Sequence, residues 1–105
     1  MPRVRIHNTT GADLDTVLLY PPASPREPID FGALSNGGYS GYHDVEPAYR
    51  FVHVEASGSI GSHVVRPYDY VGEEPLPEGR FTYRLSVDHG RLTLQLEDRS
   101  HEQDE

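Results

Sequence analysis

The sequence predicts one small all-β domain, a two-sheet antiparallel β-sandwich of about seven strands with an immunoglobulin-like arrangement. Two observations support this prediction. Apolar and polar residues alternate with a period of two wherever a clear pattern exists, and turns containing Gly or Pro recur at intervals of roughly 8–12 residues. No segment shows the 3.6-residue period of an amphipathic helix. With 105 residues, the chain has room for a single hydrophobic core.

The clearest element is a hairpin near the C-terminus. Residues 80–87 alternate strictly, with apolar side chains at the odd positions, and residues 91–97 alternate as regularly. Asp88-His89-Gly90 separates them. A connection of three residues that ends in Gly is typical of a type I turn closed by a left-handed Gly bulge, so we expect that geometry here.

The N-terminal half predicts a second hairpin. Residues 3–7 alternate, residues 8–11 form a polar turn that begins with a glycosylation sequon at Asn8, and a strand follows over residues 14–20. This second strand is apolar on both faces near its middle, so we expect it inside a sheet. Further strands are expected near residues 29–31, 39–43, 48–56 and 60–66.

The alternation also predicts which side chains fill the core and where the domain ends. We expect the sandwich to span residues 1–99 and residues 100–105, which contain no apolar side chain, to form an acidic disordered tail. The inward-facing positions of the predicted strands give the following core: Val4, Ile6, Val17, Leu19, Phe31, Leu34, Val52, Val54, Phe81, Tyr83, Leu85, Val87, Leu92, Leu94 and Leu96.

Composition excludes several classes of function. The chain has no Cys, which rules out disulfides and thiolate metal sites, and every basic residue is Arg. The formal net charge of −8 argues against nucleic-acid binding, which depends on phosphate neutralisation. No apolar run is long enough to span a membrane, and no signal peptide is visible. We therefore expect a soluble cytoplasmic protein, or an exported one if a leader has been removed.

Two stretches carry a resemblance to known proteins. Residues 76–83, Leu-Pro-Glu-Gly-Arg-Phe-Thr-Tyr, resemble the corner that enters a late strand of immunoglobulin-like and fibronectin type III-like sandwiches. Phe81 stands where the corner tyrosine would be, so its hydroxyl bond would be missing. More closely, the whole chain looks like a group of small uncharacterised bacterial β-sandwich proteins, and residues 42–51 and 67–76 carry that second resemblance. That resemblance implies a fold and no activity.

Catalysis finds little support in the sequence. Residues 57–61, Ser-Gly-Ser-Ile-Gly, approach the nucleophile elbow of hydrolases, but Ser57 occupies the place of the first Gly and the segment reads as a hairpin turn. We therefore predict that the protein is not an enzyme and needs no cofactor.

A metal site is a further hypothesis. If the hairpin that carries His53 and His63 pairs residues whose numbers sum to 116, the two imidazoles stand opposite each other with Glu55 on the same face. A register that differs by one residue removes the site. The alternative is that both are ordinary half-exposed side chains.

Two groups of side chains are candidates for binding. Outward-facing arginines form a basic patch if the first strand lies beside the last hairpin, and guanidinium groups suit carboxylate or phosphate partners. Tyrosines in irregular segments provide apolar area with a polar tip, which suits a protein or a sugar. The alternatives are cross-strand ion pairing and ordinary core filling. The candidates are Arg3, Arg5, Arg80, Arg84, Arg91, Tyr39, Tyr42, Tyr68 and Tyr70.

These observations lead to one expectation and two alternatives. We expect a non-catalytic binding or assembly module that acts through a sheet face or edge, with a protein partner or a second copy of itself. The alternatives are a carbohydrate-binding module that uses the loop tyrosines and a small metal-binding protein that uses the paired histidines.

Overall fold

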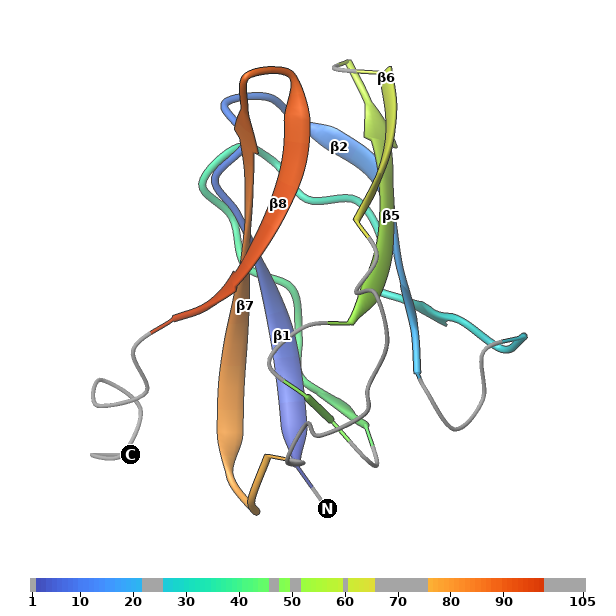
Figure 1. The fold of residues 1–105 in the computed structure, drawn as a ribbon, viewed down its shortest axis with the longest axis vertical. Helices are drawn as coiled ribbons and strands as arrows, with labels where there is room; N and C mark the ends of the chain where they lie inside the picture. Colours follow the sequence, from blue (N-terminus) through green and yellow to red (C-terminus); the bar gives the residue numbers. More distant parts are fainter. Residues whose placement is uncertain are drawn as a thin grey trace.

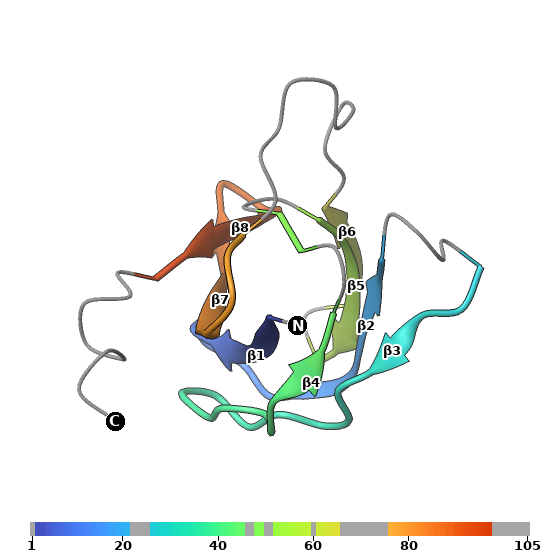
Figure 2. The ribbon, with the colours of Figure 1, turned by 90° about the horizontal axis from the view of Figure 1, so that it is seen from below.

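The described residues form two four-stranded sheets packed face to face. The computed structural model describes residues 2–21, 26–45, 48–49, 52–59, 61–65 and 76–97. One sheet has the order β4-β1-β7-β8, formed by His43–Asp44, Arg3–Asn8, Arg80–Asp88 and Arg91–Leu96. The other has the order β3-β2-β5-β6, formed by Ile29–Asp30, Leu14–Tyr20, His53–Gly58 and Gly61–Val65. Figures 1 and 2 show the two layers.

The all-β class is confirmed for the described residues, which contain no helix. It follows that none of their elements is a helix able to cross a membrane. The predicted tail at residues 100–105, like the predicted tyrosine pair Tyr68 and Tyr70, lies outside the described residues.

The prediction of purely antiparallel sheets was wrong. Strands β1 and β7 pair in parallel, with Val4 opposite Phe81 and Ile6 opposite Tyr83. The expected hairpin of β1 with β2 does not form either, because the chain crosses from one sheet to the other after Asn8 (Figure 1). Alternation of side chains predicts the face that each residue occupies, but both strand directions satisfy it equally. The parallel pair therefore could not be predicted from the pattern.

The hairpin between β7 and β8 is present, but its turn is shorter than predicted. Asp88 pairs directly with Arg91, which leaves His89 and Gly90 as the two loop residues. Their φ angles are 52° and 77°. Positive φ at both central residues defines a type I′ turn, whose twist matches that of the flanking strands. With a turn of two residues, the apolar positions of β7 pair with the apolar positions of β8.

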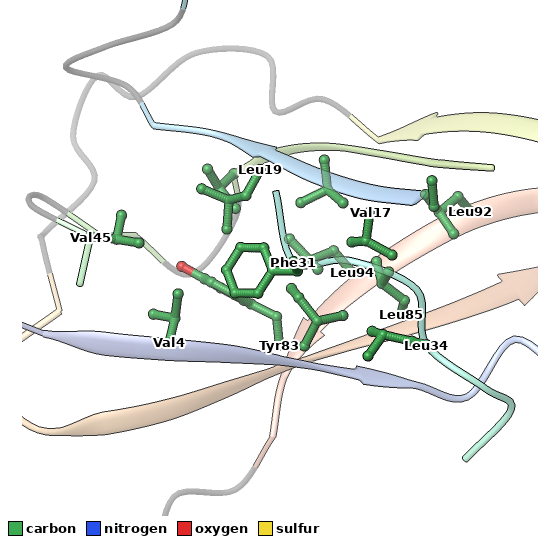
Figure 3. Close-up of a cluster of buried hydrophobic side chains, with 14 of the residues drawn as sticks. Val4, Val17, Leu19, Phe31, Leu34, Val45, Tyr83, Leu85, Leu92 and Leu94 are labelled. Carbon is green, nitrogen blue, oxygen red and sulfur yellow. The ribbon is translucent and has the colours of Figure 1, made fainter. Parts of the chain in front are cut away.

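The core lies between the sheets and is largely the predicted one (Figure 3). All the predicted core residues are buried except Val87 and Leu96, which are partly buried and pack against the others. Four small or medium side chains that were not predicted in the core are also buried: Leu14, Val45, Ala48 and Ala56. Tyr83 is fully buried, and its hydroxyl donates to the carbonyl of Tyr49. This bond ties β7 to the segment that precedes β5.

Gly58, at the end of β5, is required by a close approach of backbone. A Cβ atom at Gly58 would lie 2.6 Å from the Asp13 carbonyl oxygen and 2.9 Å from the Leu14 Cα. Backbone atoms cannot move aside as a flexible side chain can. We expect Gly58→Ala to destabilise the protein by about 1–3 kcal/mol in chemical denaturation. Gly41→Ala is the matched control, because no atom lies within 4 Å of its Cβ position. Equal losses in the two variants would contradict this account.

Candidate functional site

The outer face of the β4-β1-β7-β8 sheet gathers most of the predicted arginines. The parallel pairing places Arg3 beside Arg80 and His7 beside Arg84. The condition for a basic patch, that the first strand lies beside the last hairpin, is therefore met, and four arginines share one face. Arg91 lies opposite Asp88 at the far end of β7, four residues beyond Arg84 and so about 13 Å along the strand. It stands apart from the others.

Two of the predicted tyrosines lie on this same face. The segment between β3 and β4 runs along β1 (Figure 2), where Tyr39 forms an antiparallel bridge with His7 and β4 pairs with Arg3 and Val4. If the register of β4 continued along this segment, His7 would pair with Ser40. His7 pairs with Tyr39 instead, so the segment contains one extra residue between Tyr39 and His43. Residues three apart on a regular strand point to opposite faces. The inserted residue lets both Tyr39 and Tyr42 reach the arginines.

Ser40 supports this irregular pairing. Its Oγ accepts the N–H of Ile6 at 2.9 Å, where a regular strand would offer a carbonyl oxygen. Its own N–H donates to the Ile6 carbonyl at 2.8 Å. The backbone groups of Ile6 are therefore satisfied although the ladder is interrupted, which removes the usual cost of a buried unpaired amide.

The side chains form a stacked row that we call the arginine–tyrosine ladder: Arg80, Tyr42, Arg5, Tyr39 and His7. The Arg5 Cζ lies 4.2 Å from the centre of the Tyr39 ring and 5.0 Å from that of Tyr42. The Arg80 Cζ lies 5.7 Å from the Tyr42 ring centre. The rings of His7 and Tyr39 stack at 4.0 Å with 9° between their planes. Residues two apart on a strand stand about 7 Å apart, so the Tyr39 ring occupies the space between Arg5 and His7.

Arg5, at the centre of the ladder, is held from below by Thr82. The Arg5 Nε donates to the Thr82 Oγ1 at 2.9 Å. Thr82 points to the outer face of the sheet and yet has no exposed surface. A residue on an outer face is buried only when neighbouring side chains cover it, and Arg5 is one of them. Among the described residues, no carboxylate forms an ion pair with Arg5.

The other charged groups of this face differ from Arg5. Arg3 pairs with Asp44 at 3.3 Å, and both side chains are more than half exposed, so the pair contributes about 0–1 kcal/mol. Arg84 donates to Gln95 at 3.2 Å. At the end of the ladder, the His7 Nδ1 lies 2.5 Å from the Glu97 Oε2, with both side chains about four-fifths buried. Acidic groups therefore lie at both ends of the ladder and leave its centre cationic.

The predicted metal site does not form. His63 pairs with Ala56, and Val64 pairs with Glu55, so the paired residue numbers sum to 119 instead of 116. An odd shift places His53 and His63 on opposite faces of the sheet. The described residues contain no group of three His, Asp or Glu side chains arranged to hold a metal ion.

His53 and Glu55 instead form a small cluster with Tyr20 on the outer face of the second sheet. The Tyr20 and His53 rings stack at 4.4 Å, and the Tyr20 hydroxyl donates to the Glu55 Oε1 at 3.2 Å. Partial burial, together with the charge and the hydrogen bond of Glu55, raises the pKa of Tyr20 above its usual value.

The segment that approached a nucleophile elbow is a hairpin turn. Gly58 pairs with Gly61, and β6 follows directly, so no helix presents Ser57 or Ser59 as a nucleophile would require.

Comparison with known proteins bears on the fold. Neither a scan against protein-family models nor a search of curated proteins finds a match. Among solved structures, the chain is similar to the NMR structure of a protein from Eubacterium rectale, with a TM-score of 0.64 and 10% identity over 92% of this chain and 88% of that one. At that identity the likeness concerns the fold alone, and it extends over nearly the whole chain.

Proposed function

We propose that the protein is a non-catalytic binding module and that its binding surface is the outer face of the β4-β1-β7-β8 sheet. The observation that carries the proposal is the arginine–tyrosine ladder. Arg and Tyr are enriched among the residues that dominate the energy of protein interfaces, where each buries a large area and can also form hydrogen bonds. Tyr39, in the middle of the ladder, has 48% of its surface exposed, one of two large apolar side chains among the described residues so exposed.

The ladder favours a protein partner over a sugar. A sugar-binding platform requires an aromatic ring with an open face. The Tyr39 ring already contacts both Arg5 and His7, and the Tyr42 ring contacts two guanidinium groups. A sugar would have to displace one of these contacts, whereas a protein segment can lie across the tops of the stacked groups.

The relation to immunoglobulin-like and fibronectin type III-like sandwiches is also a proposal. The two packed sheets support it, and the parallel pair of β1 with β7 weighs against it. The binding surface does not depend on the outcome, because folds of this kind carry many unrelated sites.

Substitution of matched tyrosines on the two sheets tests the proposed surface. Sedimentation velocity over a concentration series measures self-association, and affinity capture by the full chain measures binding of other proteins. We expect Tyr39→Ser to weaken the association by about tenfold or more, as loss of a central aromatic does at interfaces. Tyr20→Ser is the control, because Tyr20 also stacks on a histidine but on the opposite sheet. If both variants bind like the unmodified protein, the proposed surface is wrong.

A further inference from the structure

We propose that Arg5 is a preorganised carboxylate-binding group and that the partner of this surface is an acidic protein segment. This inference rests on the proposed function and adds to it the chemistry of the partner. Three observations carry it: the guanidinium of Arg5 is fixed in place, its terminal nitrogens have no partner among the described residues, and its surroundings favour a single negative charge.

The guanidinium is fixed from three sides. Thr82 accepts from its Nε at 2.9 Å, and the rings of Tyr39 and Tyr42 lie at 4.2 and 5.0 Å from its Cζ. A free arginine loses considerable rotamer freedom when it binds a ligand. Because these contacts already restrict Arg5, a ligand meets a group that is held in one orientation, and less entropy is lost on binding.

Within the part of the chain that the structure describes, no group pairs with the terminal nitrogens of Arg5. A guanidinium carries five N–H donors, and Thr82 uses the one at Nε. Arg3 pairs with Asp44 and Arg84 donates to Gln95, whereas Arg5 has no carboxylate partner among the described residues. A planar pair of N–H donors matches the two oxygens of a carboxylate in a bidentate bond. The partly buried setting strengthens that bond by keeping water away.

The surrounding charges favour a carboxylate over a phosphate group. Asp44 lies beyond one end of the ladder and Glu97 at the other, and the whole chain carries a net charge of −8. A phosphate monoester brings nearly two negative charges and is usually bound by several arginines. One fixed guanidinium flanked by acidic groups suits the single charge of an Asp or Glu side chain.

A peptide-binding experiment tests the assignment on the full chain at low ionic strength. The probe is a fluorescent, end-capped peptide with three consecutive Glu residues, and its matched control has Gln in their place. We expect the Glu peptide to bind and the Gln peptide to bind at least about tenfold more weakly, because only the charged oxygens form charge-assisted bonds. Equal binding of the two peptides, or no binding of the Glu peptide at about 1 mM, would overturn the inference.

Variants of the protein locate the site. Arg5→Lys keeps the charge but removes the bidentate geometry, so we expect an affinity loss of about tenfold. Arg26→Lys makes the same change at an exposed arginine shortly before β3, on the other sheet, and should alter the affinity by less than about twofold, because Arg26 lies outside the proposed surface. Thr82→Val is expected to produce an intermediate loss for the Glu peptide and none for the Gln peptide, because Thr82 acts by positioning Arg5. Thermal melting confirms that each variant is folded.

The outcomes separate this inference from the proposed function. If Tyr39→Ser weakens association while Arg5→Lys and Arg26→Lys bind the Glu peptide equally well, the surface stands and the carboxylate assignment falls. A phosphoserine peptide that binds more tightly than the Glu peptide would replace the proposed ligand class. If neither Tyr39→Ser nor Arg5→Lys has an effect, both proposals fall.

Discussion

Replacing Asn8 by Asp is expected to destabilise the protein by about 3–5 kcal/mol near pH 7, although the two side chains have the same shape. Asn8 ends β1 with no exposed surface. Its Nδ2 donates to the carbonyls of Ala12 and Leu34 at 2.8 and 3.0 Å, and its Oδ1 accepts from the N–H and the hydroxyl of Thr10. A carboxylate has no N–H group to donate. An oxygen would stand in place of the Nδ2 and face the two carbonyl oxygens in a buried site.

The same variant should regain stability in acid. Burial and the two carbonyl oxygens raise the pKa of an Asp at this position above its value in the unfolded chain. The folded state then binds the proton more tightly, so the stability of the variant falls as pH rises from below the unfolded pKa of about 3.9. Urea titrations near pH 7 and near pH 3.5 measure the difference between the variant and the unmodified protein, which should be smaller in acid.

Asn36→Asp is the matched control for this experiment. Asn36 is exposed, and its Oδ1 accepts the N–H of Gly11 at 3.1 Å. An Asp can make the same bond from the same place, so we expect a change within about 0.5 kcal/mol. If the two variants lose equal stability, the hydrogen bonds of Asn8 do not hold the turn as described.

The role of Asn8 marks a limit of sequence interpretation. A change of chain direction near residues 8–11 could be predicted from its polar and Gly residues, but the structure has a bend over residues 10–12 that leads to the other sheet and not the predicted hairpin turn. The partners of Asn8 could not, because Leu34 is 26 residues away and reaches Asn8 only after both sheets have formed. The buried amide also shows that the sequon does not present an accessible acceptor in the folded protein.

Local alternation predicted the strands and most of the core because each depends on neighbouring residues. The β7–β8 hairpin and its inward-facing side chains, such as Phe81 and Leu85, follow from that pattern alone. The direction of β1 relative to β7 depends on how the chain crosses between sheets. The register of β5 with β6 depends on the turn length, which alternation does not determine, so the conditional pairing of His53 with His63 could be decided only by the structure.

For the candidate site too, features that depend on neighbouring residues could be predicted, and features that depend on strand pairing could not. Its arginines and tyrosines were predicted as two separate candidate groups, on strands and in loops. Their convergence required two facts of pairing: β1 lies beside β7, and one residue is inserted opposite β1 between Tyr39 and His43. Thr82 was missed because a polar residue at an outward position of a strand is ordinarily exposed. It is buried only because Arg5 and its neighbours lie over it.

Truncation of the core at β7 is the other change for which we expect a large effect. Phe81 and Leu85 are 1% and 0% exposed and face the second sheet, where Leu85 lies among the clustered side chains of Figure 3. Replacing either by Ala removes buried methyl and methylene groups, or a ring, and leaves a cavity that surrounding strands fill only in part. We expect each variant to lose about 2–5 kcal/mol of unfolding free energy, measured by urea denaturation.

Leu18→Ala separates the core effect from the chemical change itself. Leu18 lies on β2 between the buried residues Val17 and Leu19, so its side chain points to the outer face, where it is only partly buried. The same Leu to Ala substitution there should cost less than half of the loss at Leu85, because less apolar surface returns to water and no enclosed cavity forms. Similar losses at Leu18 and Leu85 would mean that the inner and outer faces of the sandwich have been assigned incorrectly. Because Arg80 occupies an outward position of β7 and Arg5 pairs with the outward-facing Thr82, such a result would also remove the geometric basis of the arginine–tyrosine ladder.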